Sequence, residues 1–115
     1  MGIFDFLTFF KTPYETITPM QAKERQSEGA LVIDVRTASE QKSGIIAGAK
    51  RVPLTSLLAQ ADLLPKDREV IAVCARGGRS ASAARLLHRQ GFERVSSVKG
   101  GMTGWKAQGL KVVAP

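Results

Sequence analysis

The stretch VIAVCARGGRS, residues 70–80, decides the fold that this chain adopts. Its first four residues form an apolar run typical of a strand that is buried on both faces of a parallel sheet. A short loop with two glycines follows, and then a helical pattern that ends near Gln90. Strand, tight loop and helix in this order predict that one thiol, that of Cys74, lies at the mouth of a loop.

The loop of residues 74–80, called here the Cys74 loop, is rich in groups that favour negative charge. Gly77 and Gly78 can adopt backbone angles that a side chain forbids, so successive N–H groups can point inward. The first turn of the next helix adds unpaired N–H groups and the positive end of its dipole. These features favour a thiolate, or an anionic group attached to its sulfur. The predicted catalytic residue is Cys74, and the predicted substrate-binding residues are Ala75, Arg76, Gly77, Gly78, Arg79 and Ser80.

Strand and helix patterns alternate along the rest of the chain. Strands are expected at residues 16–17, 31–35, 51–52, 69–73 and 94–98, and helices at 19–27, around 40, at 54–61, from the Cys74 loop to about 90, and at 102–108. This alternation predicts an α/β fold with a mostly parallel central sheet and helices on both faces. No repeat, linker or low-complexity segment interrupts it. We therefore predict one domain over residues 16–115, preceded by an apolar N-terminal extension, residues 1–15.

Polar and glycine-rich segments stand at the expected exits of several strands. Asp34 and Arg36 follow one strand, Cys74 the next, and residues 99–101 the last. Ligands of parallel sheets bind beyond the carboxyl ends of the strands, so these segments are expected to converge on one site. Arg36 and Glu40 are also spaced for an ion pair across one turn.

Four segments of the chain resemble those of the rhodanese (sulfurtransferase) family, in the family's order. They are the Cys74 loop, residues 32–36, residues 44–49 with Pro53 behind them, and residues 99–105. Together they cover nearly the whole chain, about residues 16–113. The resemblance implies a single rhodanese-like domain, a cysteine that carries sulfur as a persulfide, and no metal or cofactor. It also implies that Asp34 and Arg36 brace the surroundings of the site. The chain departs from the family at Ile45, where histidine is usual.

A site of this kind moves sulfur without a general base. The only histidine, His88, lies about nine residues into the expected helix, roughly 13 Å from its start, so a cysteine–histidine dyad is not expected. Loop amides, the helix dipole, Arg76 and Arg79 are expected to activate the thiol instead. We expect Cys74 to take sulfur from a small anionic donor such as thiosulfate. The acceptor is then a thiol, free or on a protein, or cyanide in an assay.

Two other functions stay open. Cysteine phosphatases also combine a cysteine, an amide cradle and an arginine, but their loop reads Cys-x5-Arg. Cys74 and Arg79 have the shorter x4 spacing, which suits a persulfide better than a phosphoryl group. A non-catalytic binding module can share this fold, although such modules often lack the cysteine. The net charge of +7 comes without an aromatic–basic motif, so nucleic-acid binding is not expected.

The single cysteine and the first ten residues bear on the location of the protein and on its contacts. One cysteine excludes an internal disulfide and, by itself, a multi-cysteine metal site, and a free reactive thiol favours a cytoplasmic location. Residues 1–10, MGIFDFLTFF, are shorter than the roughly 20 residues that span a bilayer, and they are a poor signal peptide. We expect them to pack on the domain or on a second copy in a homodimer. Weak contact with a membrane surface is the alternative.

Overall fold

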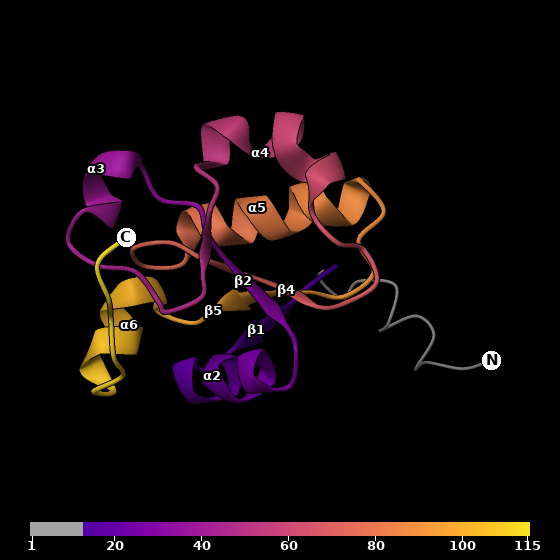
Figure 1. The fold of residues 1–115 in the computed structure, drawn as a ribbon. Coiled ribbons are helices and arrows are strands. Elements are labelled where there is room, and N and C mark those ends of the chain that lie inside the picture. Colours follow the sequence, from indigo (N-terminus) through magenta and orange to yellow (C-terminus); the bar gives the residue numbers. More distant parts are fainter. Residues whose placement is uncertain (1–12) are drawn as a thin grey trace.

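Five parallel strands form the centre of the chain (Figure 1). Their order across the sheet is β1-β5-β4-β2-β3. The strands are β1 (Glu15–Ile17), β2 (Leu31–Asp34), β3 (Lys50–Arg51), β4 (Val70–Val73) and β5 (Val95–Val98). The helices are α2 (Pro19–Ser27), α3 (Ala38–Gln41), α4 (Leu54–Gln60), the 3-10 turn η1 (Ala61–Leu63), α5 (Gly78–Arg89) and α6 (Gly101–Ala107). The predicted α/β fold is confirmed, and the sheet is entirely parallel.

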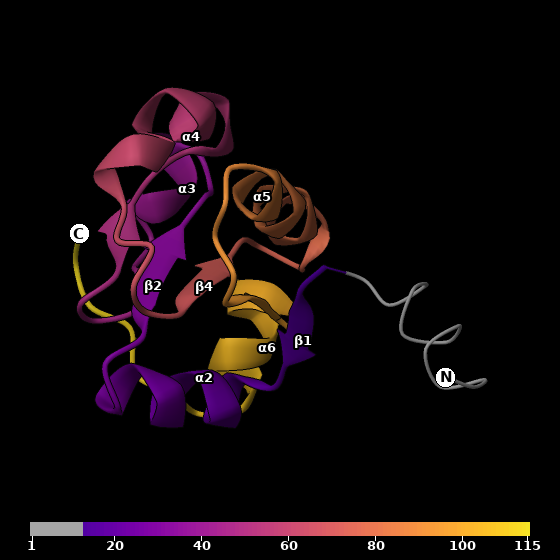
Figure 2. The ribbon, with the colours of Figure 1, turned by 90° about the vertical axis from the view of Figure 1, so that its right-hand side faces the viewer.

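Helices cover both faces of the sheet, as predicted. Helices α4 and α5 lie on one face, and α2 and α6 lie on the other (Figures 1 and 2). Side chains alternate along a strand, so β4 supplies both hydrophobic cores. Val70 and Ala72 belong to the core under α4 and α5, whereas Ile71 and Val73 belong to the core under α2 and α6. The two cores hold the central strand from both sides, which fixes the position of the residue that follows it.

Local sequence signals explain where the helices begin. Thr18 and Thr37 each form a capping box, in which the hydroxyl accepts from the N–H three residues on and that residue's side chain accepts from the threonine N–H. Helix α5 has the predicted buried stripe of Ser80, Ala83, Ala84 and Leu87. A small-residue stripe lets this helix pack closely on β4 and β5, and so holds its first turn next to the Cys74 loop.

The computed structural model describes residues 13–115. The apolar residues 1–10, and with them the homodimer and membrane contacts expected of that segment, lie outside the described residues. Within residues 13–115, no helix combines the length and the apolar character needed to cross a membrane.

Candidate active site

Cys74 directly follows β4 at the carboxyl edge of the sheet and is only 1% exposed. The start of α6 lies against its backbone: the N–H of Met102 donates to the carbonyl oxygen of Cys74 at 2.8 Å, and that of Thr103 to the carbonyl oxygen of Ala75 at 3.0 Å. The Cys74 loop, α3 and the start of α6 therefore meet at one end of the molecule (Figure 1). The structure thus brings the strand exits together, as the parallel topology predicts.

The sulfur of Cys74 lies inside a turn of hydrogen-bonding groups. The Gly77 N–H donates to Sγ at 3.0 Å, and Ser80 Oγ lies 3.5 Å from Sγ. Gly77 has a φ of +116°, in the left-handed region that glycine tolerates, and this conformation turns its N–H toward the sulfur. Gly78 has no such angle and simply begins α5, so only one of the two loop glycines is needed for its conformational freedom.

The environment of the sulfur favours its ionised form. Burial alone raises the pKa of Cys74, but hydrogen bonds from the Ser80 side chain and from the backbone of Ser80, Gly77 and Arg76 outweigh it and leave this pKa below its usual range. The Ser80 hydroxyl also lies 3.1 Å from the Gly77 carbonyl oxygen and 2.7 Å from Ser97 Oγ. When the thiol ionises, the Ser80 hydrogen can therefore turn to Sγ while Ser97 donates to Ser80.

Replacing Ser80 with alanine is expected to raise the pKa of Cys74, because the thiolate loses its hydroxyl donor. At neutral pH the rate of alkylation by iodoacetamide should fall about tenfold, since a hydrogen bond to a charged group contributes roughly 1.5 kcal/mol or more. The measurement is the alkylation rate against pH, whose inflection should move to higher pH. Ser82→Ala is the matched control, because Ser82 is exposed on the same helix and its hydroxyl bonds only the Gly78 carbonyl. Equal profiles for the two variants would contradict the role of Ser80.

The two arginines of the Cys74 loop have different surroundings. Arg79 forms a two-point ion pair with Glu40 of α3, with nitrogen–oxygen distances of 2.6 and 2.8 Å. This pair lowers the pKa of Glu40 to about 2, so Glu40 is ionised at any pH near neutrality. Arg76 is exposed, and no ion pair to another residue of 13–115 involves it. Of the two cations predicted to attract a donor, only Arg76 therefore offers an uncommitted charge.

Asp34 and Arg36 form a buried ion pair beside the site. Arg36 donates to the Asp34 carboxylate at 2.8 Å and to the Gly44 carbonyl oxygen at 2.7 Å, and both side chains are less than 5% exposed. The expected Arg36–Glu40 ion pair is wrong: Arg36 reaches only the backbone oxygen of Glu40, at 3.4 Å. The reason is that the Glu40 carboxylate caps Thr37 and pairs with Arg79, which leaves Arg36 to neutralise Asp34.

Two contacts at the site were not anticipated from the sequence. Ser97 lies in β5, and the sequence shows it only as one of two adjacent serines between the valines of this strand. Glu40 is recognisable as the third residue of a capping box, but its pairing with Arg79 depends on the packing of α3 beside α5.

His88 is exposed in the last turn of α5, away from Cys74, as expected. Within residues 13–115, no group of three or more His, Cys, Asp or Glu residues can hold a metal.

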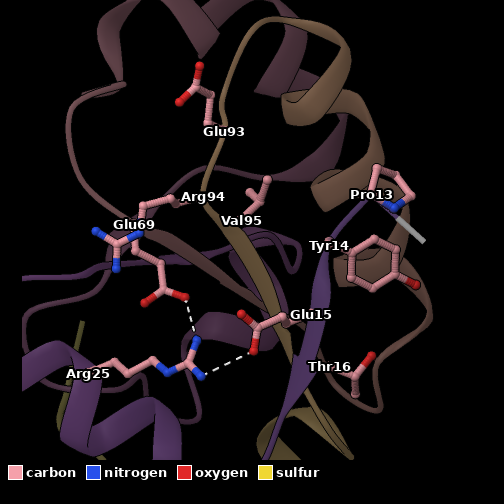
Figure 3. A pocket seen from close by; sticks show the side chains of 9 residues that line it. All are labelled: Pro13, Tyr14, Glu15, Thr16, Arg25, Glu69, Glu93, Arg94 and Val95. Carbon is pink, nitrogen blue, oxygen red and sulfur yellow. Dashed lines mark hydrogen bonds and ion pairs between the residues drawn. The ribbon is translucent and has the colours of Figure 1, made fainter. Parts of the chain in front are cut away.

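A pocket of about 520 Å³ lies at the other edge of the sheet, where the strands begin (Figure 3). Arg25 reaches into it and pairs with Glu15 and with the buried Glu69, at 3.1 and 2.9 Å. The pocket is larger than the depression of about 240 Å³ beside Ala75, but no cysteine lines it. The chemistry that the structure supports is therefore at the Cys74 edge.

Comparisons with known proteins agree with this geometry. A family model described as a rhodanese-like domain matches residues 18–108. A sulfurtransferase of Allochromatium vinosum is 37% identical over 89 residues, which is 77% of this chain and 83% of that protein. Thiosulfate sulfurtransferase GlpE of Ectopseudomonas mendocina is 38% identical over 97 residues, covering 82% and 86% of the two chains. The crystal structure of a rhodanese-related protein from Thermoplasma volcanium matches with a TM-score of 0.80 at 31% identity, covering 87% of this chain and 98% of that one.

Proposed function

Because this chain belongs to the rhodanese-like domain family, we propose that it is a sulfurtransferase that carries a sulfane sulfur on Cys74. The observation that carries the proposal is the contact of a buried sulfur with the Gly77 N–H and the Ser80 hydroxyl. These hydrogen-bond donors favour the thiolate form in which Cys74 can take up sulfur. They can also stabilise the anionic persulfide that results. The proposed donor is thiosulfate or a similar small anion, as the name of the Ectopseudomonas mendocina relative suggests.

In the first half-reaction the Cys74 thiolate attacks the outer sulfur of thiosulfate. A bond forms between Sγ and that sulfur, and the sulfur–sulfur bond of the donor breaks. Its electron pair leaves with sulfite, so charge is conserved and no external oxidant is needed. Arg76 supplies an exposed positive charge near the thiol, which favours the approach of the dianionic donor. The persulfide is then held by the amide and hydroxyl donors of the Cys74 loop.

The position of Arg79 supports sulfur transfer over phosphatase chemistry. A phosphoryl group needs an arginine that is free to bind its equatorial oxygens. Arg79, the arginine at the Cys-x4-Arg position of the Cys74 loop, is bound at two points by Glu40. The retained thiol, with its lowered pKa, likewise supports catalysis over a purely binding role.

Mass spectrometry of the intact protein after incubation with thiosulfate tests the proposal. The expected result is a gain of about 32 Da, the mass of one sulfur atom, with release of sulfite and loss of the adduct on addition of cyanide. Hydrolysis of a small aryl phosphate serves as the comparison and is expected to be absent. An unmodified protein after prolonged incubation would overturn the proposal.

A further inference from the structure

The charges around the Cys74 loop are unbalanced. Both carboxylates beside the loop, Asp34 and Glu40, are neutralised by arginines of the site itself. Three exposed cations remain there, Arg76, Lys99 and Lys106, and none of them forms an ion pair or a side-chain hydrogen bond with another residue of 13–115. The rim of the site is therefore positive, with no free carboxylate in its depression.

Each of these cations is placed by an element that contacts the loop. Arg76 belongs to the Cys74 loop itself. Lys99 lies in the segment that packs against Gly77, since a Cβ on Gly77 would be 3.9 Å from the Gly100 nitrogen and 4.0 Å from the Val98 oxygen. Lys106 lines the depression beside Ala75, on the side formed by α6. The three cations thus belong to the loop itself and to two segments that adjoin it.

The opposite edge of the sheet lacks this excess. The two neighbouring pockets there, which share Arg25, Glu69 and Arg94, are lined by three arginines and four glutamates. Their charged residues are Arg25, Arg68 and Arg94 on one side, and Glu15, Glu28, Glu69 and Glu93 on the other. Figure 3 shows Arg25 paired with both Glu15 and Glu69. The excess of unpaired cations at the thiol edge is therefore local and does not follow simply from the overall charge of +7.

The shape of the site restricts what can deliver a thiol to it. Cys74 is 1% exposed, and the depression beside the loop has a volume of only about 240 Å³. A thiol on the flat surface of a folded protein cannot reach a sulfur that is buried this deeply. An acceptor thiol can reach it only on a narrow, protruding or flexible segment.

We propose that the sulfur acceptor is a protein whose cysteine lies on a protruding, carboxylate-rich segment, which docks among Arg76, Lys99 and Lys106. This inference rests on the proposed function and names the acceptor class for the same site. The carboxylates pair with these free cations, while the acceptor cysteine approaches Cys74 at its loop. Complementary charge of this kind acts mainly on the rate of association.

The transfer step is balanced without a co-reactant. The acceptor thiol first gives its proton to the anionic Cys74 persulfide, and the resulting acceptor thiolate attacks the outer sulfur. A new sulfur–sulfur bond forms on the acceptor as the bond to Sγ breaks, and the electron pair returns to Sγ as the thiolate. The proton stays on the transferred sulfur, so the acceptor leaves as a persulfide.

Single-turnover transfer to synthetic peptides tests the inference. The protein is first loaded to completion with thiosulfate, confirmed by mass, and freed of the donor. It then reacts with three peptides in which one cysteine is flanked by glutamates, serines or lysines, and each rate is divided by that peptide's own thiolate concentration. At low salt we expect the acidic peptide to react about tenfold faster than the neutral one, and the basic peptide to react slowest. The difference should shrink at high salt, because charges are screened over a few ångströms there.

Charge-reversal variants locate the effect. Combining Lys99→Glu with Lys106→Glu should abolish or invert the preference for the acidic peptide. The matched control combines Arg68→Glu with Arg89→Glu, which changes the net charge equally, replaces exposed residues away from the Cys74 loop, and should leave the preference intact. Equal rates for the three peptides, or equal behaviour of the two double variants, would overturn the inference. Failure of the loading step would instead overturn the proposed function, so the two failures are distinguishable.

Discussion

The Cys74→Ser variant is expected to show no sulfur adduct and to lose at least about a thousandfold in sulfur transfer from thiosulfate to cyanide. A serine hydroxyl in the same turn is not ionised near neutral pH and is a poor nucleophile for soft sulfur. The measurements are intact mass after thiosulfate treatment and thiocyanate formation over time. The loss should be nearly complete because this is the only cysteine in the sequence, so no neighbouring thiol can take over.

The fold of this variant serves as its own control. Oxygen is smaller than sulfur, and Ser80 and the Gly77 N–H can bond a hydroxyl where they now bond the thiol. The melting temperature should therefore change by only a few degrees. A variant that keeps its fold and still transfers sulfur at a rate within tenfold of the parent would show that Cys74 is not the carrier.

The Gly101→Ala variant is expected to lose both stability and sulfur transfer, although Gly101 does not touch the sulfur. Gly101 has a φ of +55°, and a Cβ there would overlap the carbonyl oxygen of Cys74 and lie 2.6 and 2.7 Å from the carbonyl carbon and oxygen of Ala75. These are backbone atoms, held by the Met102 and Thr103 N–H groups, so the loop or α6 must move. We expect a loss of about 3 to 5 kcal/mol in the free energy of unfolding, from the left-handed angle and the overlap together.

Gly109→Ala separates these two causes. Gly109 has a φ of +73°, but a Cβ there would meet no atom within 4 Å. This control should lose only about 1 to 2 kcal/mol, the cost of the left-handed angle alone, and should keep its persulfide formation. Urea denaturation gives both free energies of unfolding. Equal losses in the two variants would mean that the close approach of α6 to the Cys74 loop is not a constraint.

The close approach at Gly101 also explains how the fold supports the site. Sulfur transfer needs Sγ, the Gly77 N–H and the Ser80 hydroxyl in fixed positions, yet the Cys74 loop is short and partly exposed. N–H groups of α6 bond the carbonyl groups of Cys74 and Ala75. Ser80 is held in the buried stripe of α5. The hydrogen-bonding groups around the sulfur are therefore ordered before thiosulfate arrives. This order lowers the free-energy cost of binding an anion.

The sequence alone was enough to predict the fold class and the position of the reactive cysteine. The apolar run before Cys74, the glycines after it and the alternation of strand and helix patterns predict an α/β fold with a thiol at a strand exit. These signals are local: they depend on side-chain period, on capping residues such as Thr18 and Thr37, and on the backbone freedom of glycine. For the same reason the Cys74 loop, with Ser80 at its end, could be named as the candidate site.

Only the tertiary structure decided which side chains are free and which are paired. Arg36 and Glu40 are neighbours in sequence, but burial joins Arg36 to Asp34, and the packing of α3 beside α5 joins Glu40 to Arg79. Ser97 reaches Ser80 because β5 lies next to β4, and Gly101 meets Cys74 because α6 returns to the same edge. A charge or a donor acts through distances in space, and those distances depend on how the strands are ordered in the sheet. The free cations that surround the thiol could be recognised only once these pairings were known.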